Sequence, residues 1–252
     1  MKRLIWISIA WILGSSFSWG APVLLIAVSS SFEPTVQQLQ PLFEAQTGIL
    51  LQITAASTGQ LTAQIEYGAP FDVFLSADKM HVDRLTKEGL LQEKTTTMFA
   101  IGKLVLYFLN GEPHLSRLLD PHIKTIAIAN PVIAPYGLAS EQVLKKQRIF
   151  EIIRSKMVWG QSTGQVASFV MSGHVDAAFL AQSQWIAMQR LKTHPAGQIL
   201  VLNPKDYDPI RHYASILKTS LHPEIALQLI QFLKTKKART LMQANGYQMM
   251  TA

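Results

Sequence analysis

Short apolar runs alternate with helical patterns along the chain. Runs typical of β-strands lie at residues 23–28, 51–54, 71–75, 103–109, 125–129, 177–180, 198–202 and 212–217. Several are apolar at successive positions, as are parallel strands that helices bury on both faces. Helical patterns lie between them: Ile65 follows Leu61 by four residues, and Gly68 then ends that helix. The alternation predicts an α/β fold with open, mostly parallel sheets flanked by helices.

One proline conflicts with this pattern. Pro41 lies inside the helical period formed by Val36, Leu39, Leu42 and Phe43. A proline in a helix interior removes a backbone hydrogen bond and costs about 3 kcal/mol. We therefore expect a kink or a break at Pro41.

The first twenty residues have the composition of an export signal. Lys2 and Arg3 precede an apolar stretch at residues 4–13, and small residues at 16–20 lead to Ala21. The stretch is shorter than the roughly 20 residues of a membrane span, and the chain has no cysteine to carry a lipid anchor. We expect a cleavable signal peptide over residues 1–20 and a periplasmic mature protein.

Composition excludes several functional classes. Without cysteine the chain has no disulfide, no thiolate nucleophile and no zinc site of the thiolate type. The formal net charge of +7 falls to +5 when Lys2 and Arg3 are removed with the signal. The remaining positive residues are scattered, which is typical of solvated helix faces, so we expect no nucleic-acid partner.

Two clusters of hydroxyl side chains lie where a predicted strand leads into a predicted helix. Ser30 and Ser31 follow the first strand, and Ser57 and Thr58 follow the second. Helix N-termini present unpaired amides and the positive end of the helix dipole, and hydroxyls add neutral donors. Either cluster alone is an ordinary helix cap. Two of them at the carboxyl ends of strands favour a site for an anion.

Two later segments also lie where a predicted strand leads into a predicted helix. Residues 130–137 read Asn-Pro-Val-Ile-Ala-Pro-Tyr-Gly and place Tyr136 at a predicted helix start. In the other interpretation, Tyr136 is a partly buried aromatic residue whose hydroxyl reaches water. Residues 159–165 place Thr163 at the start of another predicted helix.

The last junction also supports an alternative function. It matches G-x-S-x-G, the nucleophile elbow of α/β-hydrolases, with Ser162 as the nucleophile. Asp176 or Asp206, followed by His212 or His222, has the chain order that a triad requires. However, the preceding strand is only about three residues long, no HGGG-type oxyanion loop precedes it, and the two hydroxyl clusters would have no role. We favour a binding protein that is not an enzyme, with a serine hydrolase as the alternative.

The order of these motifs resembles that of the periplasmic molybdate-binding proteins of ABC importers. The resemblance is carried by Ala-Val-Ser-Ser-Ser-Phe at 27–32, Ser-Thr-Gly-Gln-Leu at 57–61 and the run Tyr-Gly-Ala-Pro-Phe-Asp-Val-Phe-Leu-Ser-Ala-Asp at 67–78, and it extends from about Val23 to Tyr247. It implies a monomer that captures molybdate or tungstate without a cofactor and delivers it to an inner-membrane ABC permease. Molybdenum would be bound only as the oxyanion.

The resemblance also implies the fold and the ligands. The implied fold is the two-lobed type II periplasmic-binding fold, with lobe I at 21–99 plus 208–252, lobe II at 100–207 and two crossing strands as a hinge. The family binds its anion with hydroxyls and amides from four loops, which here correspond to Ser30, Ser31, Ser57, Thr58, Tyr136 and Thr163. Departures are Ser31, where one branch of the family has asparagine, Gln161, where an acid is usual, and Ala181, where some members have tyrosine. Asp72 and Asp78 are expected to be structural, since a carboxylate repels a dianion.

Overall fold

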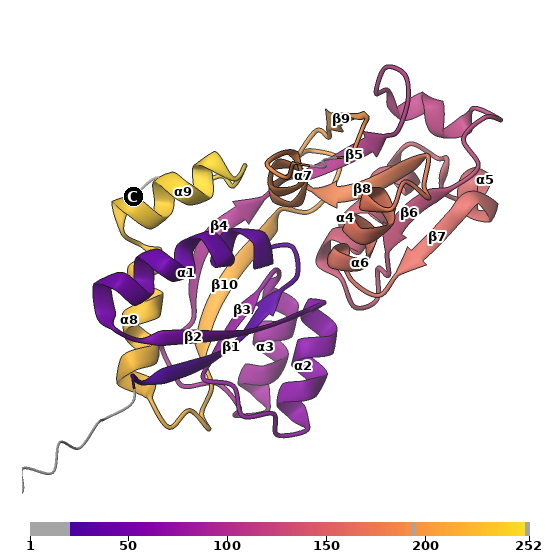
Figure 1. The fold of residues 1–252 in the computed structure, drawn as a ribbon. Coiled ribbons are helices and arrows are strands. Elements are labelled where there is room, and N and C mark those ends of the chain that lie inside the picture. Colours follow the sequence, from indigo (N-terminus) through magenta and orange to yellow (C-terminus); the bar gives the residue numbers. More distant parts are fainter. Residues whose placement is uncertain (1–20, 193–194, 250–252) are drawn as a thin grey trace, which may run out of the picture.

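The computed structural model describes residues 21–192 and 195–249. The predicted signal peptide at 1–20 lies outside the described residues. The described chain forms two lobes, each built on a five-stranded sheet with helices on both faces (Figure 1). The predicted α/β class and two-lobed architecture are therefore confirmed.

Lobe I contains the first sheet, with strand order β2-β1-β3-β10-β4. Its elements are β1 (Val23–Ser29), α1 (Glu33–Thr47), β2 (Leu50–Ala56), α2 (Thr58–Glu66), β3 (Val73–Ser76), α3 (Lys79–Lys87), β4 (Thr97–Gly102), β10 (Ile210–Ile216), α8 (Pro223–Leu233) and α9 (Lys236–Ala244). Strand β1 is parallel to β2 and β3, whereas β10 is antiparallel to β3 and β4.

Lobe II contains the second sheet, with strand order β7-β6-β8-β5-β9. Its elements are β5 (Leu104–Phe108), η1 (Leu115–Leu119), β6 (Ile126–Ala129), α4 (Pro135–Lys146), α5 (Phe150–Ile153), η2 (Arg154–Lys156), β7 (Met157–Gly160), α6 (Thr163–Met171), β8 (Ala177–Ala181), α7 (Gln182–Gln189) and β9 (Gln198–Val201). Strand β6 is parallel to β7 and β8, and β5 is antiparallel to β8 and β9. Both sheets are thus mixed rather than mostly parallel, because β10 and β5 enter them from the opposite lobe.

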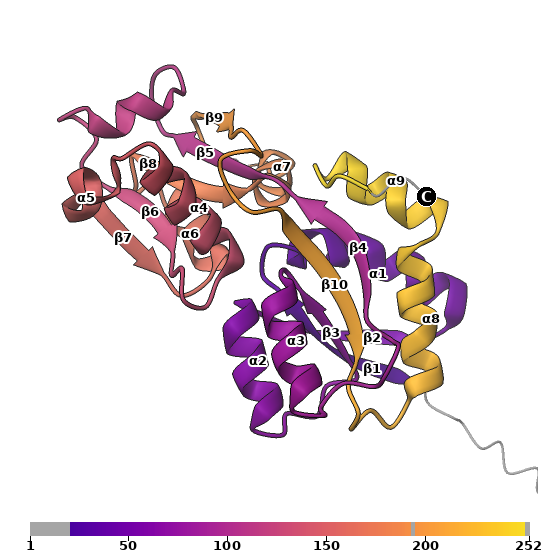
Figure 2. The ribbon, with the colours of Figure 1, turned by 180° about the vertical axis from the view of Figure 1, so that it is seen from behind.

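The chain passes between the lobes twice. It leaves lobe I at the end of β4 and enters β5 directly, and it returns from β9 through residues 202–209 into β10. Figure 2 shows β4 and β10 extending from the first sheet toward the second lobe. These two adjacent strands are antiparallel partners, with Gly102 opposite Ile210.

Each sheet separates two apolar layers. In lobe I, Leu24, Ile26 and Val28 of β1 face the core under α1, α8 and α9, while Ala27 faces the core under α2 and α3. In lobe II, one layer lies under α4 and α5 and the other under α6 and α7. The period-2 alternation of strand side chains accounts for this division. Among the helices of the described chain, none has the length and apolar composition needed to cross a membrane.

Helix α1 runs through Pro41 without a break. Pro41 is exposed, whereas Val36, Leu39 and Phe43 are buried on the opposite side. The expected break is absent because the buried face of α1 provides packing energy that exceeds the cost of one lost hydrogen bond.

Candidate functional site

Four helix starts follow the carboxyl ends of strands and carry the predicted residues. Helices α1 and α2 follow β1 and β2 in lobe I, and α4 and α6 follow β6 and β7 in lobe II. The six predicted side chains are all buried, none with more than 4% exposure: Ser30, Ser31, Ser57, Thr58, Tyr136 and Thr163. All six are uncharged, so any anion among them meets dipoles rather than ions.

Ser30 joins the two lobes directly. Its hydroxyl oxygen lies 2.9 Å from that of Thr163, the first residue of α6. The backbone amide of Gly164 donates to the same serine oxygen at 3.3 Å. The first hydroxyl cluster of lobe I therefore contacts the N-terminus of a lobe II helix, as a shared site requires.

Ser31 is held by groups that the sequence did not single out. Its carbonyl accepts hydrogen bonds from the Ser183 hydroxyl at 2.8 Å and from the Tyr247 hydroxyl at 2.9 Å. Its own hydroxyl lies 2.9 Å from that of Ser29. Ser183 is in α7 of lobe II and Tyr247 follows α9, so no spacing in the sequence connects them to Ser31.

The two hydroxyls at the start of α2 have different roles. Ser57 caps the helix: its hydroxyl donates to Gln60 Oε1 at 2.9 Å, and its amide donates to the same oxygen at 3.2 Å. Both of its donors are thus used within the cap. Thr58 Oγ1 instead accepts from the Ala77 amide at 3.3 Å, which leaves its proton available. In this loop Thr58 is the better donor to a ligand.

A backbone contact between the lobes lies beside Thr58. The amide of Gly59 donates to the carbonyl of Ile133, in the loop before α4, at 2.9 Å. A methyl group on Gly59 would lie 3.0 Å from the Ile133 Cα and Cβ atoms. Glycine at position 59 therefore lets the two lobes approach this closely.

Tyr136 is the second residue of α4, where Pro135 occupies the first helical position. Its hydroxyl is buried and has no hydrogen-bond partner within the described residues. Burial raises the pKa of this hydroxyl well above its usual range, more than the nearby Ser31 hydroxyl lowers it. The phenol is therefore protonated and its proton is uncommitted.

Backbone amides add to these donors. Among the described residues, the amides of Ser31, Thr58, Tyr136 and Thr163 are some of those at the helix starts that donate to no backbone carbonyl. Such amides at helix N-termini bind oxyanions well, because the helix dipole adds to the hydrogen bond.

The nearby carboxylates have structural partners. Asp72 accepts from the Leu25 amide at 2.8 Å and from the Ser220 hydroxyl at 2.6 Å. Asp78 caps α3, accepting from the His81 amide at 2.9 Å. These partners agree with the structural role predicted for both residues. Within residues 21–192 and 195–249 no group of three or more histidine and acidic side chains is arranged to hold a metal ion.

The hydrolase triad is not assembled. The Ser162 hydroxyl caps α6 by accepting from the Gln165 amide at 3.2 Å. Asp176 accepts from the amides of Lys124 and Thr125 at 2.8 and 2.9 Å. No histidine of the described chain is hydrogen-bonded to Ser162, and neither ring nitrogen of His212 has a partner there. The G-x-S-x-G match is a helix cap.

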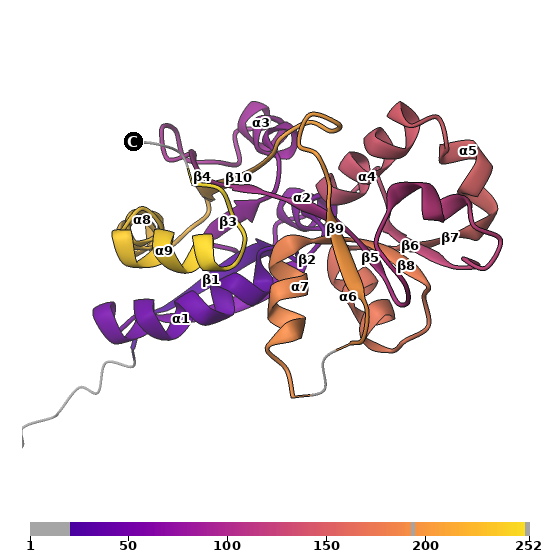
Figure 3. The same cartoon turned by 90° about the horizontal axis from the view of Figure 1, so that it is seen from above.

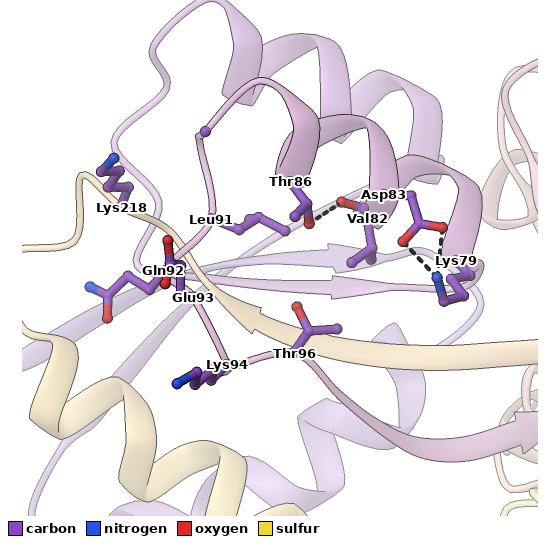
Figure 4. A pocket seen from close by; sticks show the side chains of 11 residues that line it. Lys79, Val82, Asp83, Thr86, Leu91, Gln92, Glu93, Lys94, Thr96 and Lys218 are labelled. Carbon is purple, nitrogen blue, oxygen red and sulfur yellow. Dashed lines mark hydrogen bonds and ion pairs between the residues drawn. The ribbon is translucent and has the colours of Figure 1, made fainter.

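Cavities lie both beside and away from these residues. A cavity of about 680 Å³ lies in lobe I along α3, lined by Lys79, Asp83, Lys94 and Lys218 among others, and none of the six predicted residues borders it (Figure 4). A smaller cavity of about 100 Å³ lies between the lobes, bordered by Ala77 and Pro135. None of the six predicted residues borders it, although Ala77 is hydrogen-bonded to Thr58 and Pro135 precedes Tyr136. The carboxylates of Asp78 and Asp208 also line this cavity, so it lies beside the candidate residues rather than among them.

Comparisons with known proteins agree on one family. The sequence model of the family described as bacterial extracellular solute-binding protein matches residues 24–248. The chain is 31% identical over 245 residues to the molybdate-binding protein ModA of Rhodobacter capsulatus, covering 95% of this chain and 94% of the relative. It is 35% identical over 228 residues to ModA of Azotobacter vinelandii, covering 88% of each. The solved periplasmic molybdate-binding protein of Azotobacter vinelandii superposes with a TM-score of 0.85 at 32% identity, covering 90% of this chain and all of that one.

Proposed function

We propose that this chain, which belongs to the family of bacterial extracellular solute-binding proteins, binds a tetrahedral oxyanion between its lobes and delivers it to an ABC importer. The proposed ligand is molybdate or tungstate. Two relatives that are more than 30% identical to it are molybdate-binding proteins. The protein acts by binding alone, as a monomer in the periplasm, with no catalytic step and no cofactor.

One contact supports this function most directly. Ser30 of lobe I and Thr163 of lobe II have their hydroxyl oxygens 2.9 Å apart, and both side chains are buried. Ser31, Thr58 and Tyr136 supply further uncharged donors at neighbouring helix starts. Donors drawn from both lobes can replace the water shell of a dianion only when the lobes are together.

Neutral donors suit a doubly negative ligand. Hydrogen bonds to a charged group are roughly twice as strong as neutral ones, and three or four helix starts add the positive ends of their dipoles. A counter-ion is not needed, and the anion can leave again when the lobes separate. The residues proposed to contact it are Ser30, Ser31, Thr58, Tyr136 and Thr163, with Ser57 acting through the helix start that it caps.

Selectivity follows from the same set of donors. Donors spaced for a large tetrahedral anion leave a smaller one, such as sulfate, under-coordinated. Hydrogenphosphate carries a proton that finds no acceptor in such a site, at a cost of about 1–3 kcal/mol. Molybdate and tungstate carry no proton at neutral pH and have similar size.

Binding also changes the shape of the molecule. We divide it at the crossing strands, into residues 21–99 with 208–252 and residues 100–207, and the two strands between them serve as the hinge. The oxyanion stabilises the closed form only by its greater affinity for that form. The closed form then presents a joined surface from both lobes to the permease.

Thermal unfolding with a panel of oxyanions tests this function. A ligand at 100 times its dissociation constant adds about 2.7 kcal/mol to stability, which raises the Tm of a chain of about 230 residues by about 5–11 °C. We expect this shift with molybdate and tungstate, and a smaller shift or none with sulfate and phosphate at the same concentration. If no tetrahedral oxyanion raised the Tm, the proposed function would be wrong.

A further inference from the structure

A buried histidine lies beside the candidate site and has no role in it so far. His212 is in β10, the strand through which the chain returns to lobe I, and its side chain is fully buried. Neither ring nitrogen has a hydrogen-bond partner within the described residues. A buried polar group without a partner destabilises a fold, so a histidine at this position requires an explanation.

Tyr136, which lies next to His212, also has a buried polar atom without a hydrogen-bond partner among the described residues. This atom is its hydroxyl oxygen, and the centroids of its ring and the His212 ring lie 6.2 Å apart at an interplanar angle of 60°. A methyl group on Gly102 would overlap the Tyr136 hydroxyl oxygen and lie 3.1 Å from His212 Nε2. The two polar atoms therefore converge on one glycine, at the end of β4, where the absence of a side chain leaves room for both.

The surroundings of the imidazole keep it uncharged. Phe32, Phe99 and Tyr247 pack around it, with ring centroids 5.8, 6.0 and 5.2 Å from its own. The titratable side chains among its ring contacts are Tyr136 and Tyr247, and none of these contacts carries a charge. Burial lowers the pKa of His212 to about 3. The ring is therefore neutral, with one N–H donor and one lone pair.

We propose that His212 is a positioning residue for Tyr136: in the anion-bound form its Nε2–H, which has no partner among the residues that this structure describes, donates to the phenol oxygen and so directs the single phenol proton to the bound oxyanion. This inference rests on the proposed function, because it requires Tyr136 to contact the anion. A phenol that donated to the histidine instead would turn its lone pairs toward the anion. A proton on Nε2 removes that alternative, because the nitrogen facing the phenol can then only donate. The hydrogen bond from His212 to the phenol and the one from the phenol to the anion also polarise and so strengthen each other.

A double-mutant cycle separates this role from simple packing. Molybdate affinity is measured by calorimetry for the full mature protein and for His212→Phe, Tyr136→Phe and the double variant. We expect His212→Phe to weaken binding about threefold to tenfold, as the loss of one neutral hydrogen bond does, and to have no further effect when position 136 is phenylalanine. His212→Gln, which keeps an N–H donor, should recover much of the affinity.

A surface histidine provides the matched control. The side chain of His122 is 94% exposed, so His122→Phe should leave the affinity unchanged. Equal losses from His212→Phe with and without the Tyr136 hydroxyl would overturn the inference, since they indicate a packing role. Unchanged affinity of His212→Phe or of Tyr136→Phe would overturn it too, while leaving oxyanion binding by the protein intact. Absence of any binding by the unmutated protein would instead contradict the proposed function, and this inference with it.

Nitrogen-15 NMR of the histidine side chains tests the inference on the unmutated protein. A variant is needed only to assign the His212 signals. With molybdate bound, we expect His212 to be a neutral imidazole protonated at Nε2 throughout pH 5–8. A ring protonated at Nδ1, or an imidazolium, would overturn the inference even if every variant failed to fold.

Discussion

A buried hydroxyl has one proton to donate, and the acceptor of that proton decides whether the hydroxyl can serve an anion. Ser57 donates its proton to Gln60, and Thr58 keeps its own because its oxygen accepts from the Ala77 amide. Both were predicted from one motif, since sequence alone shows a Ser-Thr pair at a helix start but not which member caps it. The sequence offered His212 only as a histidine of the hydrolase alternative. Its position beside Tyr136 could not be found in this way, because one histidine in an apolar strand has no spacing that connects it to Tyr136.

Replacing Thr58 tests whether its hydroxyl proton, which has no acceptor in the helix cap, is donated to the anion. Thr58→Val keeps the shape of the side chain but removes the hydroxyl, so molybdate should bind about 10- to 150-fold more weakly, the value of a hydrogen bond to a charged group. The fold should persist with a modest loss of Tm, because the Ala77 amide loses its acceptor. Calorimetry and thermal unfolding measure the two effects.

The control for this variant is Thr86→Val in α3. The Thr86 hydroxyl donates to the Val82 carbonyl within its own helix, away from the predicted ligands. Its replacement should leave molybdate affinity unchanged. If Thr58→Val retained the affinity of the unmutated protein, Thr58 would not be a ligand.

His212 also predicts how stability depends on pH. Its pKa is about 3 in the folded protein and near 6.5 when unfolded. Below pH 6.5 the unfolded chain therefore binds a proton that the folded protein does not, and stability falls by about 1.4 kcal/mol per pH unit down to pH 3. Between pH 7 and 4.5 the unmutated protein should lose about 2–3 kcal/mol more than His212→Phe in urea unfolding. Equal losses in both proteins would show that the folded protein takes up the proton.

At the scale of the elements, the hydrophobic pattern predicts strands that are buried on both faces. It misses strands that form because they pair with a strand distant in the sequence. All eight predicted strands are present, including β1, β5 and β8, whose residues are almost wholly buried. Strand β4 was not predicted, because its pairing with β10 involves residues more than 100 positions away. Strand β7 is short and partly exposed at the edge of its sheet, so its sequence contains only a run of about three apolar residues before the G-x-S-x-G motif. The four helix starts were predicted because caps and turns are local signals.

Helix α2 provides a prediction at this scale. The N–H of Gly59 contacts Ile133 of lobe II, and a methyl group there would be too close to that residue by a few tenths of an ångström. Gly59→Ala should therefore disfavour closure and weaken molybdate binding about fivefold or more, the cost of overpacking. Alanine is the better helix former, so the ligand-free protein should be as stable as before or more so.

The matched control lies on the same helix. Gln64 is exposed on α2, and Gln64→Ala should leave the affinity unchanged. Calorimetry for binding and thermal unfolding for stability distinguish the two variants. A Gly59→Ala protein that bound molybdate normally would indicate that this contact is not required for the bound state.

At the scale of the whole molecule, contacts between the lobes lie at both sides of the candidate residues. Helix α7 of lobe II lies beside α1 of lobe I (Figure 3), and Arg190 at its end donates to Gln38 at 2.7 Å and to Asn245 at 2.8 Å. Ser30 and Thr163 meet within the candidate site. These contacts are made by residues far apart in the sequence, which is why motif order predicted the family but not these contacts between its lobes.

The location of the bound anion tests the central claim most directly. Crystals grown with molybdate and measured at the molybdenum absorption edge give its position from anomalous scattering. We predict a single strong peak within hydrogen-bond reach of Ser31, Thr58, Tyr136 and Thr163, with no charged side chain in contact with the anion. A peak elsewhere, or one coordinated by a lysine, arginine or carboxylate, would contradict binding by uncharged donors from both lobes.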